Sequence, residues 1–206
     1  MLIEHIRSNN FGYTVVDDFY TNQELDVLWG ELKYFTSPNR FFSPDMTFSA
    51  TDEGELLKNN KSVPLDHFYQ NNRRMSDILR LNRKLFDTSI FEGFSNLHPY
   101  NQCIKECSRD YTLLSYYENG GYYNSHKDLS QFTALTWIYK EPKMFSGGEF
   151  SFPEDNIELE IKNNRMVLFP SWASHKVSEV FMDQDQEYTT DGRYCITQFL
   201  CFSSGY

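Results

Sequence analysis

From Tyr111 onward the chain consists of short β-rich segments separated by turn signals, and this pattern limits the possible folds more than any other feature. β-Branched and aromatic residues concentrate in the segments, while glycine, asparagine and aspartate separate them. The predicted strands are 112–117, 132–139, 149–152, 157–161, 166–169 and 194–202. The turn signals lie at 119–121, 147–148, 163–164 and 191–192. No helical pattern alternates with these strands, so a β-α-β fold is not expected.

Residues before 111 are predicted to be mainly helical. Thr21 and Glu24 have the spacing of a capping box, and apolar residues then recur on one face, which predicts a helix at about 22–35. A second periodic stretch predicts a helix at about 73–87. Its apolar side consists of Met75, Ile78, Leu79, Leu85 and Phe86. The polar segment 52–72 has no pattern from which an element can be predicted.

Together these patterns predict a mainly β fold with helical support, in which a double-stranded β-helix, or jelly roll, packs against N-terminal helices. A length of 206 residues fits a single domain. We expect residues 1–110 to supply the helical support and the first strands. Residues 111–206 then form the jelly-roll core.

Composition and charge narrow the classes of partner. The formal net charge of −10 disfavours binding to a phosphate backbone, so no nucleic acid is expected. No apolar run approaches the length of a membrane span and no signal peptide is readable, so we expect a cytoplasmic protein without a membrane partner. The four cysteines are too few for a disulfide framework and are expected to be free thiols. A basic cluster at positions 73, 74, 80, 83 and 84 fits the solvated side of a helix better than a contact face.

His126 and Asp128 are two residues apart after a predicted turn, and side chains at this spacing project from the same face of an extended strand. His175 is available as a third ligand from a distant strand. Two histidines and one carboxylate leave three positions of an octahedral iron(II) open, which suits oxygen chemistry better than a closed zinc tetrahedron. The spacing alone does not exclude a surface histidine beside a carboxylate that binds no metal.

The residues around this pattern carry a resemblance to a known family. Five segments occur in order: Tyr-Glu-Asn-Gly-Gly-Tyr-Tyr-Asn-Ser-His-Lys-Asp at 117–128, Phe-Ser-Gly-Gly-Glu-Phe at 145–150, Asn-Arg-Met-Val-Leu-Phe-Pro at 164–170, His-Lys-Val at 175–177 and Gly-Arg-Tyr-Cys-Ile-Thr at 192–197. They resemble the prolyl 4-hydroxylase branch of the 2-oxoglutarate- and iron(II)-dependent oxygenases. The resemblance covers about 111–202, and more loosely 15–19. By this resemblance His126, Asp128 and His175 match the iron ligands.

The resemblance also assigns residues to the cosubstrate. Arg193 matches the basic residue that binds the 5-carboxylate of 2-oxoglutarate, for which a planar guanidinium fork is suited. Tyr117 matches a tyrosine that donates to the same carboxylate, although a core tyrosine is an alternative. Thr197 is a second candidate, since the period of two places it on the Arg193 face. Trp137 stands where several family members carry a second tyrosine, and its indole can only donate. We expect Trp137 and Tyr123 to line the pocket.

The activity implied by the resemblance is hydroxylation of an unactivated C–H bond with iron(II), 2-oxoglutarate and dioxygen, stimulated by ascorbate. The favoured target is a prolyl residue in a peptide or protein. A free amino acid or another small molecule is the alternative, and repair of alkylated bases is disfavoured by the charge. A non-catalytic jelly-roll binding module is a further alternative, against which stands the presence of all five matched residues, His126, Asp128, His175, Arg193 and Tyr117.

Three lesser features complete the expectations. The stretch 178–191 is longer than the family usually shows and is rich in acidic residues, so we expect a loop at the entrance that favours a basic or neutral substrate. Gly147 and Gly148 predict a turn or a close backbone approach rather than a phosphate loop. Cys103 and Cys107 lack a second pair and do not predict a zinc site.

Overall fold

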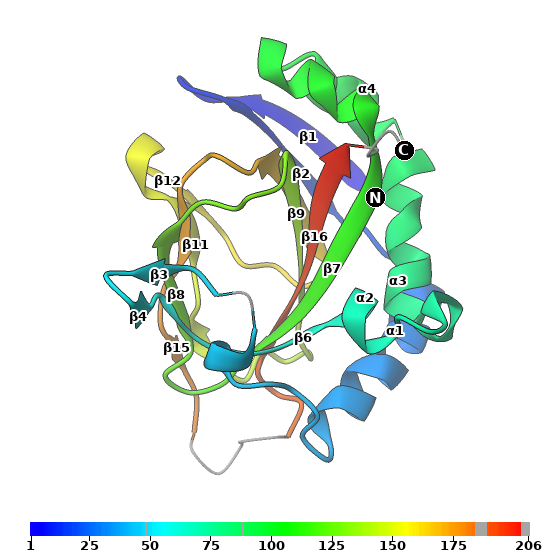
Figure 1. Cartoon of the computed structure of the whole chain (residues 1–206), viewed down its shortest axis with the longest axis vertical. Coiled ribbons are helices and arrows are strands. Elements are labelled where there is room, and N and C mark those ends of the chain that lie inside the picture. The colour runs from blue at the N-terminus through cyan, green and yellow to red at the C-terminus, as the bar shows by residue number, and fades with distance from the viewer. Residues whose placement is uncertain (48, 88, 184–188, 203–206) are drawn as a thin grey trace.

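The computed structural model describes residues 1–47, 49–87, 89–183 and 189–202, and two β-sheets face each other in it (Figure 1). The larger sheet has the order β1-β2-β13-β9-β16-β7-β6. Its strands are β1 (Leu2–Arg7), β2 (Gly12–Asp17), β6 (Lys61–Pro64), β7 (Cys107–Tyr117), β9 (Phe132–Ile138), β13 (Arg165–Pro170) and β16 (Arg193–Phe202). The smaller sheet has the order β12-β11-β14-β8-β5. Its strands are β5 (Lys58–Asn59), β8 (Tyr122–His126), β11 (Phe150–Phe152), β12 (Ile157–Leu159) and β14 (His175–Val177).

Each face of the larger sheet contributes to a separate hydrophobic core. One core lies between this sheet and the helices, and the other lies between the two sheets. Strand β9 shows both sides: Ala134 and Ile138 belong to the helix-side core, while Leu135 and Trp137 belong to the core between the sheets. Because β9 is buried on both faces, its sequence is almost continuously apolar.

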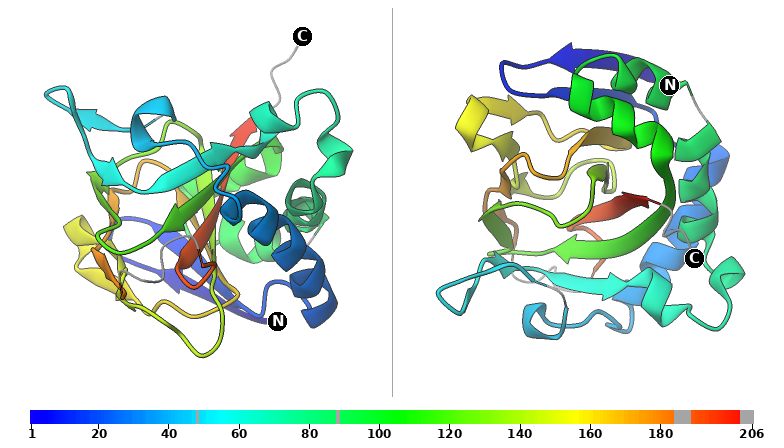
Figure 2. Two further views of the ribbon diagram at one scale, coloured as in Figure 1. Left: turned by 90° about the horizontal axis from the view of Figure 1, so that it is seen from below. Right: turned by 45° about the horizontal axis from the view of Figure 1, so that its top comes forward.

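Helices α1 (Asn22–Thr36), α3 (Asp77–Asn82) and α4 (Ile90–Ser95) lie along one side of the larger sheet, as Figure 2 shows. The predicted helix at about 22–35 is confirmed, together with its capping box. Glu24 N–H donates to the Thr21 hydroxyl over 3.3 Å, and Thr21 N–H donates to the Glu24 carboxylate over 2.8 Å. The buried face of α1 includes Leu28, Leu32 and Phe35.

The predicted helix at about 73–87 is wrong, because the segment forms three short pieces. They are η2 (Arg73–Met75), α3 and η3 (Arg83–Asp87). Ser76 breaks the run: its backbone is extended and its hydroxyl accepts from Leu79 N–H, which starts a new helix. Glu31 of α1 fixes this break, since its carboxylate accepts from the Ser76 hydroxyl at 2.7 Å and from Ile78 N–H at 2.8 Å. Met75, expected on the apolar side, is 71% exposed.

The N-terminal half contributes more strands than the helical patterns suggested. It supplies β1, β2 and β6 to the larger sheet and β5 to the smaller one. The segment 52–72 contains most of the β3–β4 hairpin (Thr51–Asp52 and Glu55–Leu56), β5, β6 and the short helix α2 (Leu65–Phe68). No helix of the described residues is long and apolar enough to cross a membrane.

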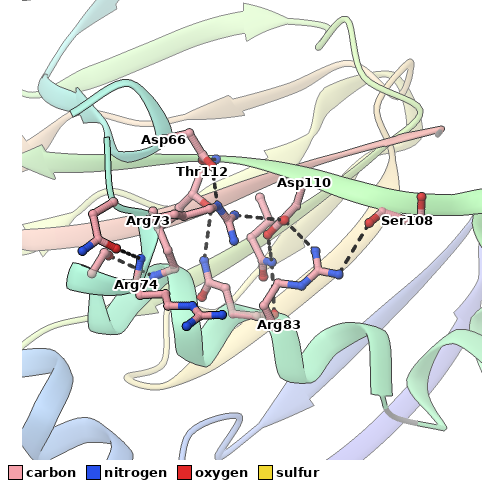
Figure 3. A network of polar contacts seen from close by, with 12 residues as sticks. Asp66, Arg73, Arg74, Arg83, Ser108, Asp110 and Thr112 are labelled. Atoms are coloured by element: carbon pink, nitrogen blue, oxygen red, sulfur yellow. Dashed lines mark hydrogen bonds and ion pairs between the residues drawn. The ribbon is translucent and has the colours of Figure 1, made fainter. Parts of the chain in front are cut away.

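Four of the five residues of the basic cluster between 73 and 84 pair with acidic side chains: Arg73, Arg80, Arg83 and Lys84. Figure 3 shows the buried Asp110 carboxylate between two arginines: Arg73 lies at 3.1 Å and Arg83 at 2.8 Å. Gln198 of β16 donates to the same carboxylate over 3.0 Å. Arg73 also pairs with Asp66 at 2.8 Å. This network, which we call the Asp110 network, joins the helical pieces to β7 and β16.

Candidate active site

The three predicted metal ligands lie together at one end of the smaller sheet. His175 of β14 stands directly opposite His126 of β8 in the antiparallel pairing. Asp128 places one carboxylate oxygen 3.7 Å from His126 Nε2 and the other 3.5 Å from His175 Nε2. One ligand atom from each residue lies within 4.8 Å of the others, and no other such cluster of three occurs in the part of the chain that the structure describes. The arrangement can hold one divalent metal ion.

Asp128 reaches this position from a loop and not from a strand. Strand β8 ends at His126, so the expected i, i+2 projection from a single strand is wrong in detail. Asp128 N–H instead donates to the Ser171 carbonyl oxygen over 3.0 Å, which anchors the loop beside β13. The Thr133 hydroxyl donates to the Asp128 carboxylate over 2.6 Å and is itself within 2.8 Å of the Ser171 hydroxyl. These contacts hold the carboxylate toward the histidines.

Both histidines turn the same ring nitrogen toward the cavity. His126 Nδ1 lies 2.8 Å from the Asn124 carbonyl oxygen, and His175 Nδ1 lies 3.0 Å from that of Ala173. A carbonyl oxygen only accepts, so each Nδ1 carries the proton and each Nε2 keeps a free lone pair. Burial, together with the neighbouring His175, lowers the pKa of His126 to about 4, and burial lowers the pKa of His175 to about 4. Both rings are therefore neutral at pH 7, the form that binds metal.

A cavity of about 70 Å³ opens beside the three ligands between the two sheets. Tyr123, which was predicted to line the pocket, lines this cavity, and so do Tyr117 and Thr197, whose predicted contact with the cosubstrate stays a prediction. Tyr123 also stacks on the His126 ring, with centroids 3.6 Å apart and planes 11° apart. Trp137 does not line this cavity; it lies fully buried beside Arg193. The sequence analysis missed the remaining lining residues, Leu113, Ser115, Leu135, Phe150, Val177, Cys195 and Phe199.

Most of the missed residues carried a signal in the sequence. Cys195 stands between Arg193 and Thr197 at the period of two that selected Thr197, and Phe199 follows at the same spacing. Ser115 and Leu113 precede Tyr117 in the same way on β7. Extending the period of two along both strands predicts these four residues.

Arg193 is a fully buried cation that has neither a hydrogen-bond partner nor an ion-pair partner among the described residues. None of its three guanidinium nitrogens has a hydrogen bond, and no ion pair joins it to another described residue. Its Cζ lies 4.9 Å from the centroid of the Tyr117 ring and 5.7 Å from that of Trp137. A buried charge is costly unless a partner compensates it. The geometry therefore suits a small anion that enters from outside the chain.

The glycine pair at 147 and 148 stands next to this arginine. Both residues have positive φ, +70° and +72°. A Cβ on Gly147 would lie 2.0 Å from the Glu179 carbonyl oxygen, and one on Gly148 would lie 3.3 Å from Arg193 Cδ. The predicted close backbone approach is confirmed, and it leaves room for the arginine side chain.

The predicted acidic loop, 178–191, can be followed only in part. Val180 exchanges backbone hydrogen bonds of 2.8 Å with Gly120 and Gly121, in the turn that precedes β8. At the other end Asp191 pairs with Lys140 at 2.7 Å. Residues 184–188 lie outside the described residues, so the role of the loop at the entrance stays a prediction. All four cysteines are free thiols.

Comparison with known proteins gives the family context. Residues 111–201 match the sequence model of the 2OG-Fe(II) oxygenase superfamily. An uncharacterized PKHD-type hydroxylase of Synechocystis sp. is 26% identical over 163 residues, which are 73% of this chain and 50% of that protein. The chain thus spans about half the length of this relative. The resemblance predicted from the motifs is confirmed.

Solved structures share the fold at low sequence identity. A Pseudomonas putida prolyl-4-hydroxylase aligns with a TM-score of 0.58 and 12% identity over 95% of both chains. A viral collagen prolyl hydroxylase from Paramecium bursaria Chlorella virus-1 aligns with a TM-score of 0.50 and 16% identity over 91% of this chain and 94% of that one. A 2OG-Fe(II) oxygenase family oxidoreductase of Burkholderia pseudomallei gives a TM-score of 0.53 and 11% identity over 92% and 84%. These likenesses confirm the predicted jelly-roll fold.

Proposed function

We propose that this chain, which matches the sequence model of the 2OG-Fe(II) oxygenase superfamily over residues 111–201 and is similar to prolyl 4-hydroxylases, hydroxylates a prolyl residue in a peptide or protein. In this proposal His126, Asp128 and His175 hold iron(II). Arg193 and Tyr117 hold the distal carboxylate of 2-oxoglutarate, with Thr197 as a further contact. Dioxygen is the oxidant and ascorbate a stimulant.

The residues at the metal end fit iron(II). Two neutral imidazoles and one carboxylate bind a divalent first-row metal on one side and leave the other side free for a chelating cosubstrate and dioxygen. Iron(II) bound there with 2-oxoglutarate and dioxygen supplies the oxidising power that replaces a C–H hydrogen with a hydroxyl group. The protein's part is to fix the ligands, which the carbonyls of Asn124 and Ala173 and the Thr133 hydroxyl do.

The unpartnered guanidinium of Arg193 is the observation that carries the proposal. It lies on the same strand as Cys195 and Thr197, which line the cavity beside the metal ligands. An ionised carboxylate that enters this cavity finds a bidentate partner there without displacing a protein acid. 2-Oxoglutarate has such a carboxylate at one end and a metal-chelating 2-oxo acid at the other.

The proposed substrate class follows from proteins of the same fold. Prolyl hydroxylases of the same fold in Pseudomonas putida and in a Chlorella virus favour a prolyl target in a peptide or protein. A free amino acid or another small molecule is the second candidate, because the same fold and site serve several substrates. The net charge of −10 disfavours nucleic acid. Incubation with proline-containing peptides and with free amino acids, read by intact mass, tests the choice: the proposal fails if only the amino acids gain an oxygen atom.

The cosubstrate assignment is tested by titrating 2-oxoglutarate into the iron-loaded protein and following the metal-to-ligand charge-transfer band. Arg193→Ala should weaken binding by at least about 3 kcal/mol, on the order of a hundredfold, because it removes a two-pronged hydrogen bond to a charged group. Arg193→Lys should restore part of this, since an ammonium keeps the charge without the planar fork. Iron binding should be unchanged in both variants.

Arg74→Ala, at an exposed arginine outside the cavity, is the matched control and should bind 2-oxoglutarate as the wild type does. Wild-type affinity in Arg193→Ala would mean that the carboxylate is held elsewhere.

A further inference from the structure

Lys58 of β5 is a buried cation close to the candidate metal site. The residue is 3% exposed, and its ammonium donates to the hydroxyl of Thr47 over 3.0 Å and to that of Ser62 over 3.4 Å. Both acceptors are neutral. No carboxylate of the described residues raises the pKa of Lys58, which burial lowers to about 8. The side chain is therefore mostly an ammonium ion at pH 7, without an opposite charge from the described residues.

One aromatic ring separates this ammonium from a metal ligand. Lys58 stands directly opposite Tyr123 in the pairing of β5 with β8, so both side chains point between the two sheets. Lys58 Nζ lies 5.6 Å from the centroid of the Tyr123 ring. His126 stacks on the same ring with centroids 3.6 Å apart. The Tyr123 hydroxyl accepts from Ala50 N–H over 3.2 Å, which fixes the ring between the cation and the ligand.

We infer that the Lys58 ammonium sets the charge balance of the candidate metal site, opposing a bound cation and favouring an anion beside it, an inference that rests on the proposed function. A full charge in the protein interior acts over about 10 Å, because solvent screens it little there. Beside Lys58 a divalent metal ion is held less tightly than beside a neutral residue of similar length. An anionic ligand of that metal is held more tightly.

Formal charges leave Lys58 uncompensated in the proposed complex as well. Both histidine rings are neutral, so the charges of iron(II), Asp128 and Arg193 together balance those of doubly ionised 2-oxoglutarate. Lys58 then adds one positive charge that neither the described residues nor the cosubstrate offsets. Its effect on the metal and on the anion therefore persists after both have bound.

A purely structural role is the simpler alternative. In it the ammonium only joins β5 to Ser62 of β6 and to Thr47, which follows η1 (Pro44–Met46). Replacing a structural lysine loosens Tyr123 and His126, which weakens the binding of the metal and of its anionic ligand alike. Removing a charge changes these two affinities in opposite directions. The sign of the change therefore separates the two roles.

Two neutral variants measure that sign. Lys58→Met keeps the length of the side chain, and Lys58→Gln keeps a donor toward the Thr47 hydroxyl. Both should bind Mn²⁺, which suits the same ligand types, about tenfold more tightly than the wild type does. Loaded with Mn²⁺, both should bind 2-oxoglutarate about tenfold more weakly. The EPR signal of free Mn²⁺ gives the metal affinity, and calorimetry gives the affinity for 2-oxoglutarate.

Lys176→Met is the matched control, because it removes the same charge from an exposed lysine that directly follows His175. Solvent screens that charge, so both affinities should stay within about twofold of the wild type. Thr47→Val removes an acceptor of the Lys58 ammonium and leaves its charge, and it should also bind both ligands as the wild type does.

The outcomes keep this inference apart from the proposed function. If the wild type binds both ligands, a fall in both affinities in the neutral variants, or no change in either, overturns the inference and leaves the proposed function standing. If the wild type binds Mn²⁺ but not 2-oxoglutarate, the proposed function is wrong and the Mn²⁺ affinity alone decides the inference. A wild type that binds neither overturns both.

Discussion

Strands β7 and β16 pair along their whole length and carry two buried charges with opposite surroundings. At one end, on the helix side, the Asp110 carboxylate accepts from Arg73, Arg83 and Gln198. At the other end, facing the smaller sheet, the Arg193 guanidinium has no hydrogen-bond partner in the described protein. Both charges are almost wholly shielded from solvent, so burial alone does not distinguish them. What distinguishes them is whether the described residues supply a hydrogen-bonded partner of opposite charge.

This contrast separates stability from ligand binding. A charge that is closed by protein partners, as in the Asp110 network, stabilises the fold and offers nothing to a ligand. A buried charge left without such partners costs the unliganded fold free energy and makes binding of the right ion favourable. The same distinction applies to the candidate metal ligands. The Nδ1 atoms of both histidines bond to carbonyl oxygens and the Asp128 carboxylate accepts from Thr133, while the histidine Nε2 lone pairs stay available to a metal ion.

The largest expected effect is on metal binding by Asp128. Asp128→Ala should weaken metal binding by more than about a hundredfold, since even residues that only support a ligand often contribute tenfold to a hundredfold. The metal-free variant should unfold within about 1 kcal/mol of the metal-free wild type, because burial raises the pKa of Asp128 and its charge is unfavourable without metal. Equilibrium dialysis against iron(II), with urea unfolding of the metal-free proteins, measures both. A large loss of stability would mean that Asp128, like Asp110, stabilises the fold through its protein partners.

The second prediction compares the stability of variants at the two ends of the β7–β16 pair. Asp110→Ala should lower the free energy of unfolding by about 3 kcal/mol, the low end for a broken buried ion pair, because the two arginines it leaves are about two-fifths exposed. Arg193→Met should lower it by less than about 1 kcal/mol, since the guanidinium loses only its contacts with the Tyr117 and Trp137 rings and no hydrogen bond or ion pair. Urea unfolding of both metal-free variants measures the difference. An equal loss of stability in Arg193→Met and Asp110→Ala would contradict the contrast between the two buried charges.

The smallest expected effect is at Asp17, whose carboxylate pairs with two basic side chains near the surface. Hydrogen bonds from Arg165 and Lys162 lower the pKa of Asp17 from 3.8 to about 2. The unfolded chain therefore takes up the proton first as the pH falls, so this stabilisation is complete above about pH 4 and lost as the pH falls through about 2. We expect about 1–2 kcal/mol, reduced by solvent screening.

Unfolding of Asp17→Asn at pH 6 and at pH 2.5 measures this contribution, with Asp26→Asn at an exposed helical aspartate as the control. The variant should lose stability relative to the wild type at pH 6 and much less at pH 2.5. An equal loss at both values would show that the aspartate contributes by something other than its charge.

The sequence predicted the parts of this molecule that depend on local pattern. Strands β7, β9, β11, β12, β13 and β16 follow from β-branched and aromatic runs, and the start of α1 follows from its capping box, whereas β8 and β14 were not among the predicted strands. The helix at about 73–87 was predicted wrongly because a carboxylate from another element, Glu31, holds Ser76 in an extended conformation. A tertiary contact of this kind leaves no trace in the periodicity of the segment.

The candidate site was predictable to a similar degree. The motifs pointed to His126, Asp128 and His175, which the structure brings together, and the period of two pointed to Thr197, which lines the cavity beside them. Two facts needed the three-dimensional structure: that Asp128 approaches from a loop anchored on Ser171, and that Trp137 stands beside Arg193 with an unpaired N–H. Both depend on contacts between residues far apart in the sequence.

Because β14 pairs directly with β8, the candidate site can assemble only after both strands have been synthesised. A ribosome produces residues in order, so His126 and Asp128 emerge while His175 is still to be made, and Arg193 follows later on a strand that must insert between β7 and β9. A nascent chain that ends before these two strands has two of the three candidate metal ligands and no buried guanidinium, so the candidate site is incomplete until β14 and β16 have joined their sheets.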